Sequence, residues 1–84
     1  MSYEVVLSPH GARDLDRFIG RPYDRLRAAI DALTNNPRPL RCTKLTGSDE
    51  WRIRVGEYRI RYLIDDAARV VVITRIAHRK DIYR

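Results

Sequence analysis

The chain has 84 residues, which is enough for one small domain but too few for two separate cores, so we expect residues 1–84 to form a single domain. It carries 17 Lys and Arg against 11 Asp and Glu, a formal net charge of +6 that favours nucleic acid or an acidic protein as partner. The longest apolar run, residues 70–73, is too short for a membrane-spanning helix, and the single cysteine excludes an internal disulfide, so the sequence predicts a reduced, cytoplasmic domain without a membrane segment.

The first half of the chain predicts one strand followed by two helices. Residues 3–7 are typical of a short strand, and Ser8 before Pro9 is the signature of a helix N-terminus. Apolar residues then recur at helical spacing up to Gly20, which we expect to end this helix. A second amphipathic helix follows and stops at residues 35–37, so the two helices form a hairpin with an apolar inner face.

After the helices the hydrophobic period changes from 3.6 to 2. Residues 41–45 form either a short strand or an irregular segment, whereas residues 51–55 and 58–64 alternate around a two-residue turn at Gly56–Glu57. Residues 70–76 begin with an apolar run, which indicates a central strand. The predicted class is α+β, with the N-terminal strand and the two-helix hairpin packed on an antiparallel sheet of three to four strands.

Four arginines on the predicted hairpin are expected to share one face of the sheet. The two-residue turn sets Arg54 opposite Arg59. The same register sets Arg52 opposite Arg61, with no carboxylate between the four side chains. Like charges that face each other destabilise a sheet by a few tenths to about 1 kcal/mol a pair. A solvated charged face is the simple alternative, but the spacing of about 6.6–7 Å along each strand favours a polyanion site.

Further basic residues lie beside this predicted face. If Ile64 pairs with Val70, Arg59 sits opposite Arg75, which would extend the face to the next strand. The strand end is followed by His78, Arg79 and Lys80, with Tyr83 close behind. Loops at strand ends commonly carry reactive groups, so this ending is a candidate site.

The available side chains suit one reaction class. His10 and His78 have no clustered carboxylates or thiols, and no glycine-rich phosphate loop is present, so the sequence predicts neither a metal nor a cofactor. Arginine, histidine and tyrosine remain, and these groups suit metal-free cleavage of RNA by attack of the neighbouring 2′-hydroxyl.

The stretch KLTGSDEWRIRVGEYRIRYLIDD, the valine-rich strand after it and the ending AHRKDIYR together resemble the RelE family of toxins from bacterial toxin–antitoxin pairs. The resemblance spans essentially the whole chain. It implies a RelE-like fold and a ribosome-dependent endoribonuclease that cleaves mRNA in the decoding site. It also implies a cognate acidic antitoxin that wraps and neutralises the toxin in a hetero-oligomer.

The resemblance assigns roles to single residues. Arg59 matches a phosphate-binding arginine, and Arg79 matches an arginine that stabilises the transition state or the leaving group. Tyr83 matches a terminal catalytic tyrosine that stacks on or activates the substrate nucleotide. The expected RNA-binding residues are Arg52, Arg54, Arg61, Lys44, Arg75 and Lys80.

One departure from the family pattern concerns proton transfer. Well-known members carry lysines where this chain has Arg52 and Arg54. Arginine does not give up its proton at working pH, so it is not a general base. Either His78 and Tyr83 are the proton carriers, or catalysis is slower and depends on electrostatics.

Two other functions remain open from the sequence. The related ParE group shares the fold and poisons DNA gyrase without cutting RNA. A non-catalytic domain that only binds nucleic acid or its partner is the third alternative.

Overall fold

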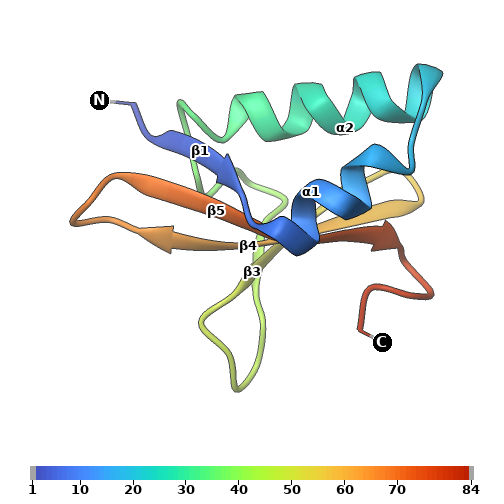
Figure 1. Ribbon diagram of the computed structural model, residues 1–84. Coiled ribbons are helices and arrows are strands. Elements are labelled where there is room, and N and C mark those ends of the chain that lie inside the picture. The colour runs from blue at the N-terminus through green and yellow to red at the C-terminus, as the bar shows by residue number, and fades with distance from the viewer. Residues whose placement is uncertain (1, 84) are drawn as a thin grey trace.

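The structure, a computed structural model, describes residues 2–83. Its elements in chain order are β1 (Glu4–Leu7), α1 (Pro9–Asp16), α2 (Gly20–Ala32), β2 (Thr43–Lys44), β3 (Trp51–Val55), β4 (Tyr58–Asp65) and β5 (Val70–His78). Both helices lie on one side of the sheet, and the segment after β5 descends on the other side (Figure 1). The α+β class predicted from the sequence is confirmed.

The sheet has five strands in the order β1-β5-β4-β3-β2, one more than the predicted maximum. The additional strand is β1, which joins the sheet as an edge strand parallel to β5. All other pairs are antiparallel, so the sheet is mixed. Parallel neighbours need a long crossover, and the two helices form part of the connection between β1 and β5. The predicted central position of β5 is confirmed.

Both predicted helices are present, but the boundary between them differs from the prediction. The Ser8 hydroxyl accepts a 3.0 Å hydrogen bond from the Gly11 amide, and Pro9 occupies the first turn, so the predicted N-cap is confirmed. Helix α1 ends at Asp16, earlier than predicted, and Gly20 begins α2 with a φ of +64°. A residue without Cβ adopts that conformation at little cost. Neither helix within residues 2–83 is long and apolar enough to cross a membrane.

The core lies between the helices and the sheet. Helix α1 comes so close to β5 that a Cβ on Gly11 would lie 2.4 Å from the Ile73 carbonyl oxygen. The Tyr62 ring is fully buried, and its hydroxyl donates a 2.7 Å hydrogen bond to the Pro37 carbonyl. The buried core residues are Leu15, Leu26, Ile30 and Leu33 from the helical half and Ile53, Ile60, Tyr62, Val71, Ile73 and Ile76 from the sheet.

The register between β3 and β4 is the predicted one, with Arg54 opposite Arg59 and Arg52 opposite Arg61. The register predicted between β4 and β5 is wrong. Strand β4 extends to Asp65, which pairs with Val70 and leaves a shorter turn of residues 66–69. An irregularity after Arg61 then shifts the pairing further, as a β-bulge does.

Candidate nucleic-acid interface

Arg52, Arg54, Arg59 and Arg61 occupy the sheet face that the helices leave uncovered, and we call this surface the arginine face. Strand alternation produces it, because the residues between them, Ile53 and Ile60, are buried in the core beneath the helices. Two strands thus contribute two arginines each, in directly opposed pairs.

The pair Arg52–Arg61 is compensated by a carboxylate that the sequence analysis did not include. One Glu50 oxygen accepts a hydrogen bond from Nη2 of Arg61, and the other accepts from the Thr74 hydroxyl. The side chains of Arg61 and Glu50 are 21% and 14% exposed, so this ion pair is screened less than a surface pair. Extending the alternation of β3 back by one residue would have placed Glu50 on this face.

The charges of the opposed pair Arg54 and Arg59 are accommodated by other contacts. Nη1 of Arg59 donates to the carbonyls of Gly56 and Tyr58, at 2.9 and 2.8 Å. Desolvation is the largest cause that lowers the pKa of Arg59, and the neighbouring arginine charges lower it further. Arg54 is exposed to solvent. Among residues 2–83, no carboxylate lies within hydrogen-bond distance of these two guanidinium groups, so the outer part of the arginine face concentrates positive charge.

The segment after β5 brings Tyr83 onto the arginine face. Nη1 of Arg52 donates a 3.0 Å hydrogen bond to the Tyr83 hydroxyl. The guanidinium carbon of Arg61 lies 5.6 Å from the centre of the Tyr83 ring, which is a cation–π distance. Ile82 is fully buried, and its carbonyl accepts a 2.9 Å hydrogen bond from Arg61. Tyr83 remains 57% exposed and is therefore accessible from solvent.

Arg79 lies at the hairpin end of the same face. Its amide donates a 2.8 Å hydrogen bond to the Glu57 carbonyl, and its Nε lies 3.3 Å from Oε2 of Glu57. Its charge is one of those that lower the pKa of Arg59. The structure thus brings together Arg59 and Arg79, which the sequence placed in one site.

His78 shares Oε2 of Glu57 with Arg79, at 3.6 and 3.3 Å, but its ring packs on the helical side of the sheet. His78 pairs with Tyr58, and their rings meet edge-on with centres 6.1 Å apart, while Tyr58 also contacts Phe18. These rings line a hollow of about 340 Å³ on the helical side of the sheet. Nδ1 of His78 accepts a 3.2 Å hydrogen bond from the Lys80 amide, and Nε2 lies 3.6 Å from the Glu57 carboxylate. The imidazole is therefore engaged away from Tyr83.

Arg75 also differs from the expectation. It sits opposite Arg61 rather than Arg59, because the pairing of β4 with β5 begins one residue away from the predicted register and the β-bulge adds one more. Its Nε donates a 2.9 Å hydrogen bond to Asp14 of α1, whose carboxylate is only 3% exposed. The same oxygen accepts a 2.8 Å hydrogen bond from the Ile76 amide. This contact draws Arg75 toward α1, so it does not extend the arginine face.

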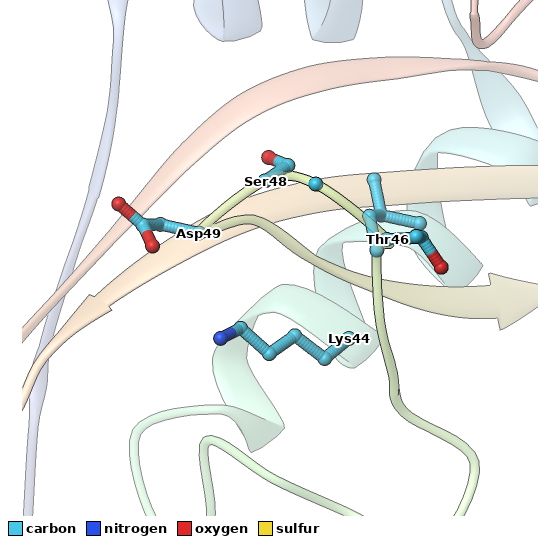
Figure 2. A pocket seen from close by; sticks show the side chains of 6 residues that line it. Lys44, Thr46, Ser48 and Asp49 are labelled. Atoms are coloured by element: carbon cyan, nitrogen blue, oxygen red, sulfur yellow. The ribbon is translucent and has the colours of Figure 1, made fainter.

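The two lysines are both exposed. Figure 2 shows Lys44 beside the loop that joins β2 to β3, where it lines an open hollow of about 510 Å³ together with Thr46, Ser48 and Asp49. None of the four sheet arginines lines this hollow. Lys80 follows β5 and precedes the buried Ile82. Among residues 2–83, no group of three or more His, Cys, Asp or Glu side chains is placed to hold a metal ion.

Comparisons with known proteins show the family and the fold to which the chain is similar. The sequence profile of the family described as the ParE toxin of the type II toxin–antitoxin system parDE matches residues 5–83. The toxin RelG of Mycobacterium tuberculosis is 37% identical over 89 residues, covering 100% of this chain and 99% of RelG. The fold is similar to a chain of the M. tuberculosis toxin–antitoxin complex RelBE2, with a TM-score of 0.84, 28% identity, and coverage of 94% of this chain and 100% of that one.

A second solved structure is an archaeal RelE–RelB complex from Pyrococcus horikoshii. The matched chain has a TM-score of 0.83 and 26% identity, with coverage of 96% of this chain and 99% of that one. Sequence and fold therefore match over nearly the same length.

Proposed function

The chain belongs to the RelE/ParE family of toxins from type II toxin–antitoxin systems, and from this premise we propose that it is a ribosome-dependent endoribonuclease that cleaves mRNA. The observation that carries the proposal is the position of Tyr83 between Arg52 and Arg61 on the arginine face. A surface that only bound nucleic acid would not need a phenol hydroxyl held by a guanidinium.

The role that we propose for each arginine depends on which of its N–H groups already donate hydrogen bonds within the chain. Nη1 of Arg59 donates to two backbone carbonyls, so Nη2 and Nε are the nitrogens left to bind a phosphoryl oxygen. Arg54 and Arg79 add charge beside it, where negative charge develops in the transition state. Arg61 donates from both of its terminal nitrogens within the chain, so we assign it to holding the site rather than to binding RNA.

Tyr83 is the proposed proton donor. In the reaction the 2′-oxygen bonds to the adjacent phosphorus, the bond from phosphorus to the 5′-oxygen breaks, and a 2′,3′-cyclic phosphate forms. The 2′-hydroxyl proton passes to water, and the Tyr83 hydroxyl gives its proton to the leaving 5′-oxygen. Because this hydroxyl accepts its hydrogen bond from Arg52, its own proton remains free to be donated.

The proposed partner is an acidic antitoxin that forms a hetero-oligomer with the chain in the cytoplasm. The supporting observations are the net charge of +6, the concentration of positive charge around Arg54 and Arg59, and the antitoxin complexes among the structural relatives. Carboxylates from the partner would pair with the same arginines that bind RNA, so neutralisation and substrate binding exclude each other.

Inhibition of DNA gyrase is the second candidate, favoured by the ParE description of the matching family. Two measurements after induction in bacteria separate the two. Primer extension on cellular mRNA should reveal new 5′ ends within coding regions, and a DNA-damage reporter should stay silent. Damage signalling without new mRNA ends would replace the nuclease proposal with the gyrase one.

Arg59→Ala tests whether the arginine face is responsible. We expect the variant to lose growth arrest and mRNA cleavage, and the salt slope of RNA binding to fall by about one counterion. Arg21→Ala is the matched control, because it removes the same charge from an exposed position on α2. A folded Arg59→Ala variant that arrests growth as fully as Arg21→Ala would contradict the assignment.

A further inference from the structure

Glu50 is a partly buried carboxylate that the proposed reaction does not use. It ends the loop between β2 and β3, and its side chain is only 14% exposed. The loop fixes its backbone, since its amide donates a 3.0 Å hydrogen bond to the Ser48 hydroxyl and its carbonyl accepts one of 3.0 Å from Leu45. The backbone of Glu50 is therefore fixed by the loop, independently of the contacts that its side chain makes.

The carboxylate joins three strands. It receives hydrogen bonds from Arg61 on β4 and from Thr74 on β5, while Glu50 itself directly precedes β3. Thr74 lies at the β-bulge, and its hydroxyl is also 3.1 Å from the Arg61 carbonyl. Bulges re-aim side chains, and here the irregularity places a hydroxyl beside the carboxylate.

Arg61 connects Glu50 to the segment after β5. With Nη2 fixed by Glu50, Nη1 donates to the Ile82 carbonyl and the guanidinium lies against the Tyr83 ring. Ile82 is fully buried, so the segment is fixed by packing on one side of Tyr83 and by Arg61 beneath it. Within residues 2–83 the Glu50 carboxylate is hydrogen-bonded to Arg61 and Thr74 but not to Tyr83, so it is linked to Tyr83 through Arg61.

We propose that Glu50 is a positioning residue for Tyr83, because it orients Arg61 so that the guanidinium holds the Ile82 carbonyl and the Tyr83 ring on the arginine face. Without the carboxylate, Arg61 would face Arg52 across the hairpin with no compensating charge. Arg61 would then turn toward solvent and release the segment after β5. The role in catalysis rests on the proposed function, whereas the structural role does not.

The structural part is tested by hydrogen exchange of the amides of residues 79–83, which needs no activity. Glu50→Gln keeps the shape but removes the charge, and its amide nitrogen accepts no hydrogen bond. We expect exchange in this segment to rise by about 10-fold while the amides of β4 and β5 keep their protection. Asp49→Asn is the matched control, because it removes a charge from the neighbouring exposed residue, whose side chain projects outward from the loop in Figure 2.

The catalytic part is tested by single-turnover cleavage on programmed ribosomes. We expect Glu50→Gln to lower the maximal rate by about 10- to 100-fold without weakening ribosome binding, since misplacement of a reacting group affects the chemical step. Adding Glu50→Gln to Arg61→Met should slow cleavage no further, because the two residues act in series.

The outcomes separate this inference from the proposed function. Faster exchange of residues 79–83 in Glu50→Gln supports the positioning role even if the wild type cleaves no mRNA. Unchanged exchange overturns it. Where the wild type cleaves mRNA, a Glu50→Gln rate equal to that of Asp49→Asn overturns its catalytic part. A double variant that is much slower than Arg61→Met also overturns it, because Glu50 would then act by another route.

Discussion

The Tyr83 hydroxyl and the Arg52 guanidinium, which lie 31 positions apart in the chain, are joined by a hydrogen bond of 3.0 Å. Arg52 belongs to β3, and Tyr83 lies beyond the last strand, so the fold must bring the end of the chain back across the sheet to form this contact. This hydrogen bond connects a strand that carries arginines with a segment that supplies a phenol.

Tyr83→Phe should separate stacking from proton transfer. Phenylalanine keeps a ring for Arg61 to contact and loses only the hydroxyl bonded to Arg52. We expect single-turnover cleavage to fall by about 100-fold or more, as for other acids and bases, while ribosome binding stays near that of the wild type. A Tyr83→Phe enzyme with the wild-type rate would show that the ring alone is used.

His78→Gln should leave cleavage within a few-fold of the wild-type rate. The imidazole contacts Tyr58 on the helical side of the sheet and is not among the groups around Tyr83. The same single-turnover assay decides the question, with circular dichroism to confirm folding. A loss as large as that of Tyr83→Phe would mean that His78 is a proton carrier after all and that the strand end rearranges on the ribosome.

Asp66 predicts a pH dependence of stability. Arg38 donates to both of its oxygens, at 3.1 and 2.8 Å, and Tyr3 donates at 2.6 Å. The hydrogen bonds from Arg38, followed by that from Tyr3, lower the pKa of Asp66 to about 2 from a usual value of 3.8. A lowered pKa in the folded state means that the stabilisation is complete above the unfolded value and is lost as the pH falls through the folded one.

The measurement compares the melting temperatures of the wild type and Asp66→Asn between pH 7 and pH 2. We expect the wild type to melt higher by a constant margin down to about pH 4, and the margin to shrink toward zero near pH 2. The effect is small because the pair lies at the surface. Asp49→Asn should show no such closing margin, and a gap for Asp66→Asn that persists unchanged to pH 2 would contradict the assignment.

Gly11→Ala should destabilise the fold although alanine is the better helix former. The new methyl group would lie 2.4 Å from the Ile73 carbonyl oxygen, and a backbone atom in a central strand cannot move aside cheaply. We expect the free energy of unfolding to fall by about 1–3 kcal/mol in chemical denaturation, the usual cost of overpacking. A variant as stable as the wild type would show that α1 is free to shift away from β5.

Local chemistry in the sequence was sufficient for most of the elements. The cap at Ser8, the alternation in β3 and β4, and the glycine-containing turn between them depend on near neighbours, so the α+β class and the pairing of Arg52 with Arg61 were predicted correctly. Composition and alternation also placed four arginines on one face, because a strand has a side-chain period of two.

Only the tertiary structure decided how those arginines are used. The β-bulge between β4 and β5, the pairing of Arg75 with Asp14 and the position of His78 on the helical side depend on contacts between segments far apart in the chain. The Glu50–Arg61 pair and its hold on the segment that carries Tyr83 are of the same kind. Periodicity fixes the face to which a side chain belongs, whereas the partner it meets there depends on registers and crossings that long-range packing selects.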